Sequence, residues 1–116
     1  MKITRRGELY QISRVTGPTH NYLGLTTSPG HLSHPPRVVA CTKDGEAARI
    51  AEAPLLAAVQ AGVEDASRSI GWPLSIALVE YVTGDTPDYA LYQVMARLLA
   101  LAAWQDSQDG NAETRS

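Results

Sequence analysis

Apolar and polar side chains alternate with a period of two in the first part of the chain. The alternation covers residues 9–15, stops at Gly17-Pro18 and resumes over residues 22–27, as in a half-buried β-hairpin. Gly24, inside the second segment, indicates a bulge or a close approach by another group. Residues 28–36 contain three prolines and predict an exposed loop, because proline lacks a backbone donor and disfavours helix before it.

A further pair of strands is expected after this loop. Residues 37–42 have strand-like composition, with the single cysteine, Cys41, as a small buried hydrophobe. The Lys43-Asp44-Gly45 sequence is typical of a tight turn. The pattern therefore predicts a second hairpin, with residues 47–51 as its returning strand.

The second half of the chain changes to a helical period. Proline at position 54 is compatible with the first turn of a helix, and Gly71 followed by Trp72-Pro73 predicts its end. Between them one apolar stripe recurs at spacings of three and four: Leu55, Val59, Val63, Ala66 and Ile70. Residues 74–82 then form a continuous apolar run rich in β-branched residues, which predicts a central strand.

A second helix should follow this strand. Thr86 is expected as its N-cap, with Pro87 at the first helical position. The buried stripe is predicted to contain Leu91, Val94 or Met95, Leu98, and Leu101 or Ala102. The layout predicts one α+β domain over residues 1–105, a two-layer sandwich of N-terminal antiparallel hairpins followed by helix, strand and helix. Residues 106–116 are polar and are expected to form a flexible tail.

Composition narrows the function. The 116 residues include 10 Lys and Arg against 12 Asp and Glu, a net charge of −2, which argues against DNA or RNA binding. One cysteine cannot form an internal disulfide. No apolar run is long enough to span a membrane, and the charged start is not followed by the apolar stretch of a secretion signal. We therefore expect a cytoplasmic protein without membrane association.

Catalytic and metal-binding signatures are not evident in the sequence. No serine lies in a nucleophile elbow, and the glycines do not form a phosphate loop. His31 and His34 lie in the proline loop without thiolate partners, so a metal site there is less expected than an incidental role. We expect no catalytic residues, no metal and no cofactor.

Two groups of residues are candidates for ligand binding. The first is the hairpin segment Thr19, His20, Asn21 and Tyr22 together with Arg14. Its donors suit a phosphate or carboxylate, although a well-made turn explains the same residues. The second group offers rings, donors and a cation on the last helix: Trp72, Tyr81, Thr83, Asp85 and Arg97.

The order of elements resembles that of the Thoeris anti-defence sponges of phages. The similarity covers most of the chain and includes Val63, Ile70-Gly71, Val79-Glu80-Tyr81-Val82, Asp85-Thr86-Pro87 and Tyr92. Such sponges are oligomers that sequester cyclic nucleotide immune signals without cleaving them. The resemblance implies that Arg14 and Arg97 contact phosphates, that Trp72 or Tyr81 stacks on adenine, and that Thr83 and Asp85 bind a base edge or ribose. The layout also resembles domains of the ribosomal protein S5 type.

The candidate residues predict a non-enzymatic binding protein, and the resemblance implies that it acts against host anti-phage immunity. It would be a homo-oligomer, located in the host cytoplasm if phage-encoded, that sequesters a small anionic nucleotide such as a cyclic nucleotide or cyclic ADP-ribose. One alternative is a module that binds and inhibits a protein through an exposed edge strand or the proline loop. Another is a small enzyme that uses His20 with Asp85.

Overall fold

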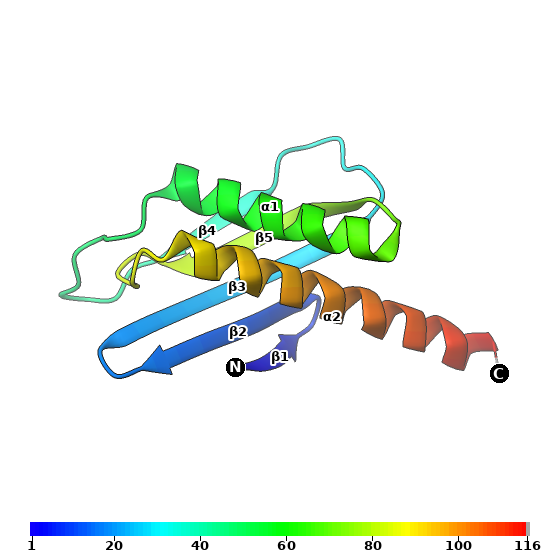
Figure 1. Cartoon of the computed structure of the whole chain (residues 1–116), viewed down its shortest axis with the longest axis horizontal. Coiled ribbons are helices and arrows are strands. Elements are labelled where there is room, and N and C mark those ends of the chain that lie inside the picture. The colour runs from blue at the N-terminus through cyan, green and yellow to red at the C-terminus, as the bar shows by residue number, and fades with distance from the viewer. Residues whose placement is uncertain (116) are drawn as a thin grey trace.

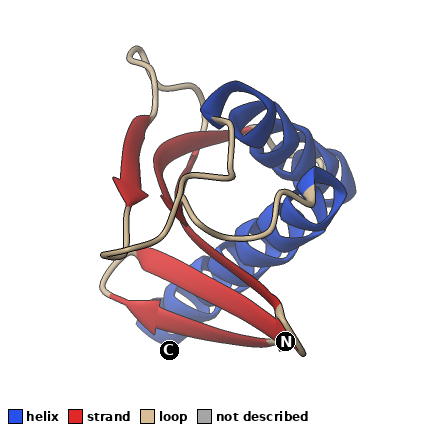
Figure 2. Cartoon of the chain, turned by 90° about the vertical axis from the view of Figure 1, so that its left-hand side faces the viewer, coloured by secondary structure: helices blue, strands red, loops and turns tan. Residues whose placement is uncertain are grey.

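The chain folds into one mixed β-sheet with two helices packed on one of its faces (Figures 1 and 2). The computed structural model describes residues 1–115, with side chains through residue 109. Its elements are β1 (Lys2–Arg6), β2 (Leu9–Thr16), β3 (Thr19–Pro29), β4 (Arg37–Cys41), α1 (Glu52–Ile70), β5 (Leu74–Val82) and α2 (Tyr89–Arg115). The predicted α+β sandwich, with antiparallel N-terminal hairpins followed by helix, strand and helix, is confirmed.

The strand order in the sheet is β1-β2-β3-β5-β4. β5 pairs antiparallel with β3 on one side and parallel with β4 on the other, so the prediction of a central strand is confirmed. Its apolar composition suits this place, since its backbone is paired on both edges and its buried residues join the core beneath the helices. The chain that leaves β5 therefore emerges between the start of β3 and the end of β4.

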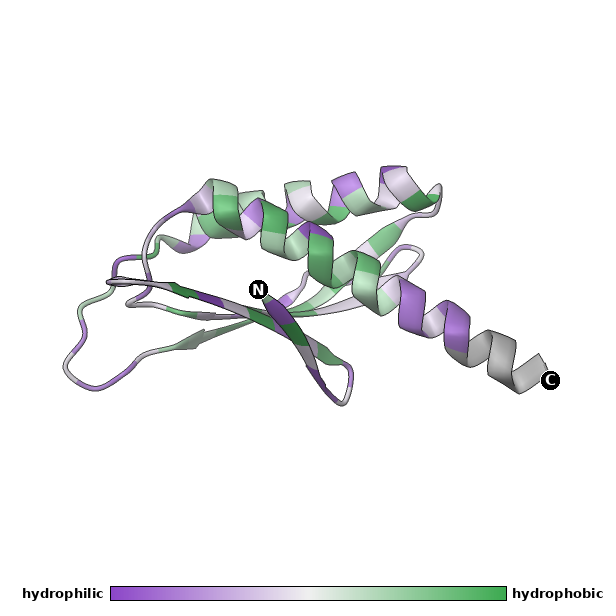
Figure 3. Cartoon of the chain, turned by 60° about the horizontal axis from the view of Figure 1, so that its bottom comes forward, coloured by the Kyte–Doolittle hydropathy of each residue, from purple (hydrophilic) through white to green (hydrophobic). Residues whose placement is uncertain are grey.

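The core lies between the sheet and the helices. Figure 3 shows hydrophobic segments recurring along both helices above the sheet, and the buried residues of the helices and strands form one cluster. The predicted stripe of α1 is buried at Leu55, Val59, Val63 and Ala66. In α2 the predicted stripe is buried at Leu91 and Met95, while Leu98, Leu101 and Ala102 are half-buried and the alternative Val94 is 49% exposed. The buried positions of that helix are Leu91, Tyr92, Met95, Ala96, Leu99 and Ala100.

Local patterns mispredicted three segments. Residues 47–51 are not a strand, because β4 pairs with β5 and the chain instead crosses the end of the sheet toward α1. Residues 2–6, not predicted as a strand, form the edge strand β1. The cap of α2 is Asp88, whose Oδ1 accepts from the Leu91 amide at 3.2 Å, and not Thr86.

The last helix continues through residues 106–115, which we expected to form a polar tail. Ser116, the final residue of that expected tail, lies outside the described residues. Neither described helix has the length and hydrophobicity needed to cross a membrane.

The two helices approach each other closely at Gly62. A Cβ at this position would overlap the carbonyl oxygen of Gln93, and would lie 2.9 Å from the Ala96 Cβ and 3.0 Å from the Arg97 amide nitrogen. Two of these three contacts are with backbone, which cannot rotate away. Gly62 therefore sets the spacing between α1 and α2.

We predict that Gly62→Ala destabilises the protein by about 1–3 kcal/mol, the usual cost of overpacking, even though alanine favours helix. Urea denaturation measures the change in the free energy of unfolding. The control is the reverse change at the exposed position 57 of the same helix, Ala57→Gly, which should cost about 1 kcal/mol from helix propensity alone. A Gly62→Ala variant as stable as the wild type would contradict the close contact.

Candidate functional site

Three segments meet where β5 leaves the sheet. The Thr83 amide donates to the Cys41 carbonyl at 2.8 Å, and the Thr83 carbonyl accepts from the Arg49 and Ile50 amides at 2.7 and 3.0 Å. The Thr86 amide donates to the His20 carbonyl at 3.1 Å. These backbone bonds hold the start of β3, the β4–α1 connection and the β5–α2 loop together.

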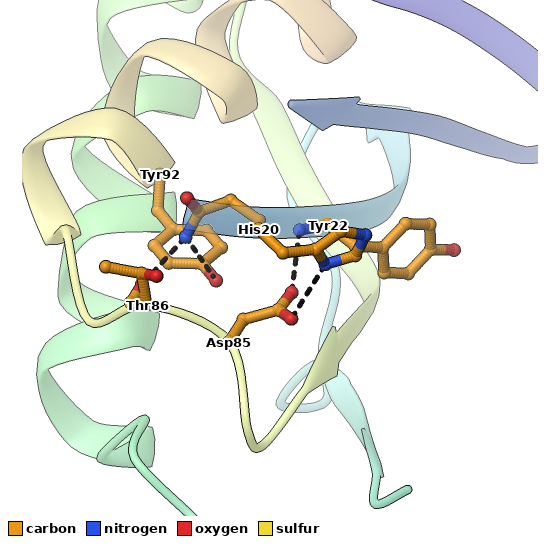
Figure 4. Close-up of polar contacts among 6 residues, drawn as sticks. His20, Tyr22, Asp85, Thr86 and Tyr92 are labelled. Carbon is orange, nitrogen blue, oxygen red and sulfur yellow. Dashed lines mark hydrogen bonds and ion pairs between the residues drawn. The ribbon is translucent and has the colours of Figure 1, made fainter. Parts of the chain in front are cut away.

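Asp85 is the central polar group of this junction. Its side chain is only 3% exposed; Oδ1 lies 3.0 Å from His20 Nδ1 and Oδ2 accepts from the Tyr22 amide at 2.9 Å (Figure 4). Because a carboxylate accepts here, Nδ1 of His20 holds a proton. The other ring nitrogen, Nε2, is left for an outside partner, and the His20 side chain is 42% exposed.

Asn21 has a supporting role. Its side chain is fully buried, and Nδ2 donates to the Thr86 carbonyl at 2.7 Å and to the Tyr92 hydroxyl at 3.2 Å (Figure 4). Among the residues described, its Oδ1 has no hydrogen-bond partner. Burial raises the pKa of Tyr92 to about 12, so this phenol remains a neutral partner. Asn21 thus joins β3 to α2 and is covered from solvent.

A pocket of about 300 Å³ opens beside His20, at the lower end of the range of about 300–1,000 Å³ for small-molecule sites. We call it the His20 pocket; its polar and basic lining includes His20, Lys43, Glu46, Arg49, Asp85 and Thr86. Within the described chain, neither Lys43 nor Arg49 forms an ion pair within 4.0 Å. The pocket therefore offers two uncommitted cations and an oriented imidazole.

The Tyr22 side chain does not line this pocket. Its hydroxyl donates to Glu80 Oε1 at 2.5 Å and accepts from Gln11 Nε2 at 2.8 Å, and Arg6 Nη2 lies 4.0 Å from the Glu80 carboxylate. Burial and the hydrogen bond to Glu80 raise the pKa of Tyr22 to about 12. Tyr22 therefore contributes only its backbone amide to the junction.

The remaining residues of the first predicted group lie near the same junction. Thr19 pairs with Thr16 at the β2–β3 turn, and exposed Arg14 lies opposite Asn21 in the sheet. Neither Thr19 nor Arg14 lines the His20 pocket. Of the second group, Asp85 lies in the junction and Thr83 lies beside it, its Oγ1 3.0 Å from Thr42 Oγ1.

The predicted rings and the helix cation lie elsewhere. Trp72 is 52% exposed and precedes β5, so it lies at the opposite end of that strand from Asp85 (Figure 1). Tyr81 is 4% exposed and belongs to the core, which leaves no ring face for a ligand. Arg97, on α2, lies beside Asp65 and Arg68 of α1 on the surface of the two helices. The structure does not bring these three side chains to His20.

Sequence analysis missed three charged residues of the pocket: Lys43, Glu46 and Arg49. The local pattern of their segment predicts a hairpin turn and a strand, in which these side chains would not share a pocket. A cluster of alternating charges beside Gly45 was the available signal. Their convergence on His20 depends on the hydrogen bonds to Thr83, which no local pattern shows.

Comparison with known proteins gives no family for this arrangement. No protein-family model and no curated protein matches the sequence. In the part of the chain that the structure describes, no group of three or more His, Cys, Asp or Glu side chains could hold a metal ion. The site is therefore interpreted from its own geometry.

We predict that stability falls between about pH 10 and 12 as Tyr22 titrates. The unfolded tyrosine has a pKa of about 10, and that of folded Tyr22 is about 12. In this window the folded state binds more protons than the unfolded state, so raising the pH favours unfolding. The pKa of Tyr22 is obtained by titrating the tyrosinate absorbance of the wild type and subtracting that of Tyr22→Phe.

Glu80→Gln serves as the partner variant. It removes the negative charge beside the phenol, so the pKa of Tyr22 should fall toward 10, while that of Tyr92 stays near 12. An unchanged Tyr22 titration in Glu80→Gln would contradict the role of this contact.

Proposed function

We propose that the protein binds a small phosphorylated molecule in the His20 pocket and releases it chemically unchanged. The observation that supports this most is the convergence of Lys43 and Arg49, from one connection, on an imidazole held by a buried carboxylate. Phosphate oxygens are acceptors only, and basic side chains that lack an internal partner are their natural donors.

The other groups in the pocket favour a phosphate joined to a sugar. Glu46 also lines the pocket, and its carboxylate, which can only accept hydrogen bonds, would bind a hydroxyl group of the sugar and not a phosphate oxygen. A carboxylate that binds ribose hydroxyls is a common element of nucleotide sites. Pocket volume and lining together favour a ribose phosphate or a nucleotide fragment of similar size.

A nucleotide immune signal is the specific ligand that we propose, in line with the sequence resemblance. Sequestration requires only that the ground state is bound, because a site that does not favour the transition state does not accelerate a reaction. Homo-oligomerisation and a role against host immunity remain predictions. Trp72, Tyr81 and Arg97 are not part of the proposed pocket.

We expect Lys43→Gln and Arg49→Gln each to weaken binding by about tenfold, the loss typical of one charge-assisted hydrogen bond. Isothermal titration calorimetry with pyrophosphate, a cyclic dinucleotide and cyclic ADP-ribose measures the dissociation constants. Arg97→Gln is the control of equal charge change and should bind as the wild type does. Equal weakening by Arg97→Gln, or full binding by the Arg49→Gln variant, would refute the pocket.

A hydrolytic or isomerising enzyme is the second candidate function, favoured by the contact between His20 and Asp85. A buried carboxylate that orients Nδ1 leaves Nε2 as a general base, as in catalytic dyads and triads. The same geometry serves proton abstraction when Nε2 is unprotonated, and phosphate binding when Nε2 carries a proton and donates. The two candidate functions are distinguished by whether the bound nucleotide is released intact or converted to a product.

We expect nucleotides that bind to be recovered intact after the protein is denatured, as judged by mass spectrometry. His20→Gln should then weaken binding without altering any product pattern. If instead the wild type converts the nucleotide, and His20→Gln and Asp85→Asn abolish conversion while retaining binding, the protein is an enzyme and sequestration is wrong.

A further inference from the structure

A larger pocket lies at the other end of the sheet, beneath the C-terminal half of α2. Its volume is about 430 Å³, and its lining comes from β1, β2, β3, β5, α2 and the loop after β3. We call it the Trp104 pocket after its largest side chain. None of the residues predicted from sequence as ligand contacts lines it.

A β-bulge forms the floor of this pocket. Thr26 pairs with Leu78 and Thr27 with Ile76, so Ala77 is left without a partner in β3. Bulges bend a strand and are common beside binding sites. Ala77 and, across the pocket, Ala103 have the smallest side chains in the lining, so the space between α2 and the sheet stays open.

The loop after β3 forms one wall and is fixed in place. The Gly30 amide donates to the Pro73 carbonyl at 2.8 Å, and the Leu32 amide donates to Ser75 Oγ at 3.2 Å. Ser75 Oγ also donates to the Gly30 carbonyl. The proline-rich segment is therefore anchored to β5, and the pocket has a defined boundary on this side.

The polar lining is arranged around Asp106. Its Oδ2 accepts from the Tyr10 hydroxyl at 2.7 Å and lies 3.8 Å from Arg5 Nη1. The Arg5 guanidinium lies 5.3 Å from the centre of the Tyr10 ring, and its Nε donates to the Gly7 carbonyl. Both of the described contacts of Asp106 use Oδ2, and neither uses Oδ1. The Asp106 side chain is 48% exposed, so Oδ1 is accessible from the pocket. This oxygen is free to accept from a ligand.

The charges of the lining disfavour an anion. Glu8 and Asp106 supply two carboxylates, and the one arginine, Arg5, is already engaged by Asp106, Tyr10 and Gly7. Trp104 adds a large planar surface that binds flat rings, and binds them more tightly when they carry positive charge. The His20 pocket differs, because its two carboxylates, Glu46 and Asp85, are balanced there by Lys43 and Arg49.

We propose that the Trp104 pocket binds a small planar ring bearing an amino or amidine group, with the ring against Trp104 and the nitrogen donating to Asp106. The ligand is neutral or singly positive. This site is separate from the His20 pocket, so it stands or falls independently of the proposed function.

Benzamidine and benzoate are matched probes, because they share a ring and differ in charge. Trp72→Phe leaves Trp104 as the single tryptophan, since the chain contains two, and its fluorescence then reports on this pocket. We expect a saturable fluorescence change with benzamidine, a weaker one with adenine and none with benzoate. An equal response to benzoate and benzamidine overturns the proposal. So does the absence of a saturable response to both benzamidine and adenine.

Asp106→Asn in the Trp72→Phe background should weaken benzamidine binding by about tenfold. Asp109→Asn, an exposed carboxylate on the same helix outside the pocket, is the matched control and should leave binding unchanged. Ala103→Leu tests the cavity itself and should abolish binding by filling it. Circular dichroism shows that each variant is folded; benzamidine binding unaffected by both Asp106→Asn and Ala103→Leu would place the probe elsewhere and refute the site.

Discussion

The hydrogen bonds accepted by the buried Asp85 carboxylate are the interaction on which the candidate site depends. A carboxylate removed from water is costly unless its oxygens are satisfied, and here His20 Nδ1 and the Tyr22 amide meet that need. The loop after β5 is thereby fixed to β3. With Asn21 bound to the Thr86 carbonyl, the same contacts set where α2 begins.

The topology explains why the two ends of the sheet differ in chemistry. Insertion of β5 between β3 and β4 brings the β4–α1 connection to His20, and with it Lys43 and Arg49. At the other end, the bulge at Ala77 and the small Ala103 leave an open, net acidic space beside Trp104. One end therefore suits a phosphate, and the other suits a planar ring with a hydrogen-bond donor.

The sequence predicted the parts of the fold that depend on local periodicity. Both helices, the hairpin of β2 and β3, and the central β5 follow from apolar spacing. The formation of β1 and the parallel pairing of β4 with β5 depend on tertiary contacts, which no local pattern contains. Thr86 is a residue type favoured at N-caps, but Asp88, two residues later, caps the helix by accepting from the Leu91 amide. His20 and Asp85 were predicted as contacts; Lys43 and Arg49 were not, because only long-range backbone bonds bring them to the pocket.

The most direct test of the account is an amide chemical-shift map recorded by nuclear magnetic resonance during titration with pyrophosphate. An anion in the His20 pocket should shift the amides of His20, Arg49, Gly84 and Thr86, and leave those around Trp72, Arg97 and Trp104 in place. Shifts confined to the helix surface around Arg97, or spread evenly over all basic residues, would contradict a built anion site at the end of β5.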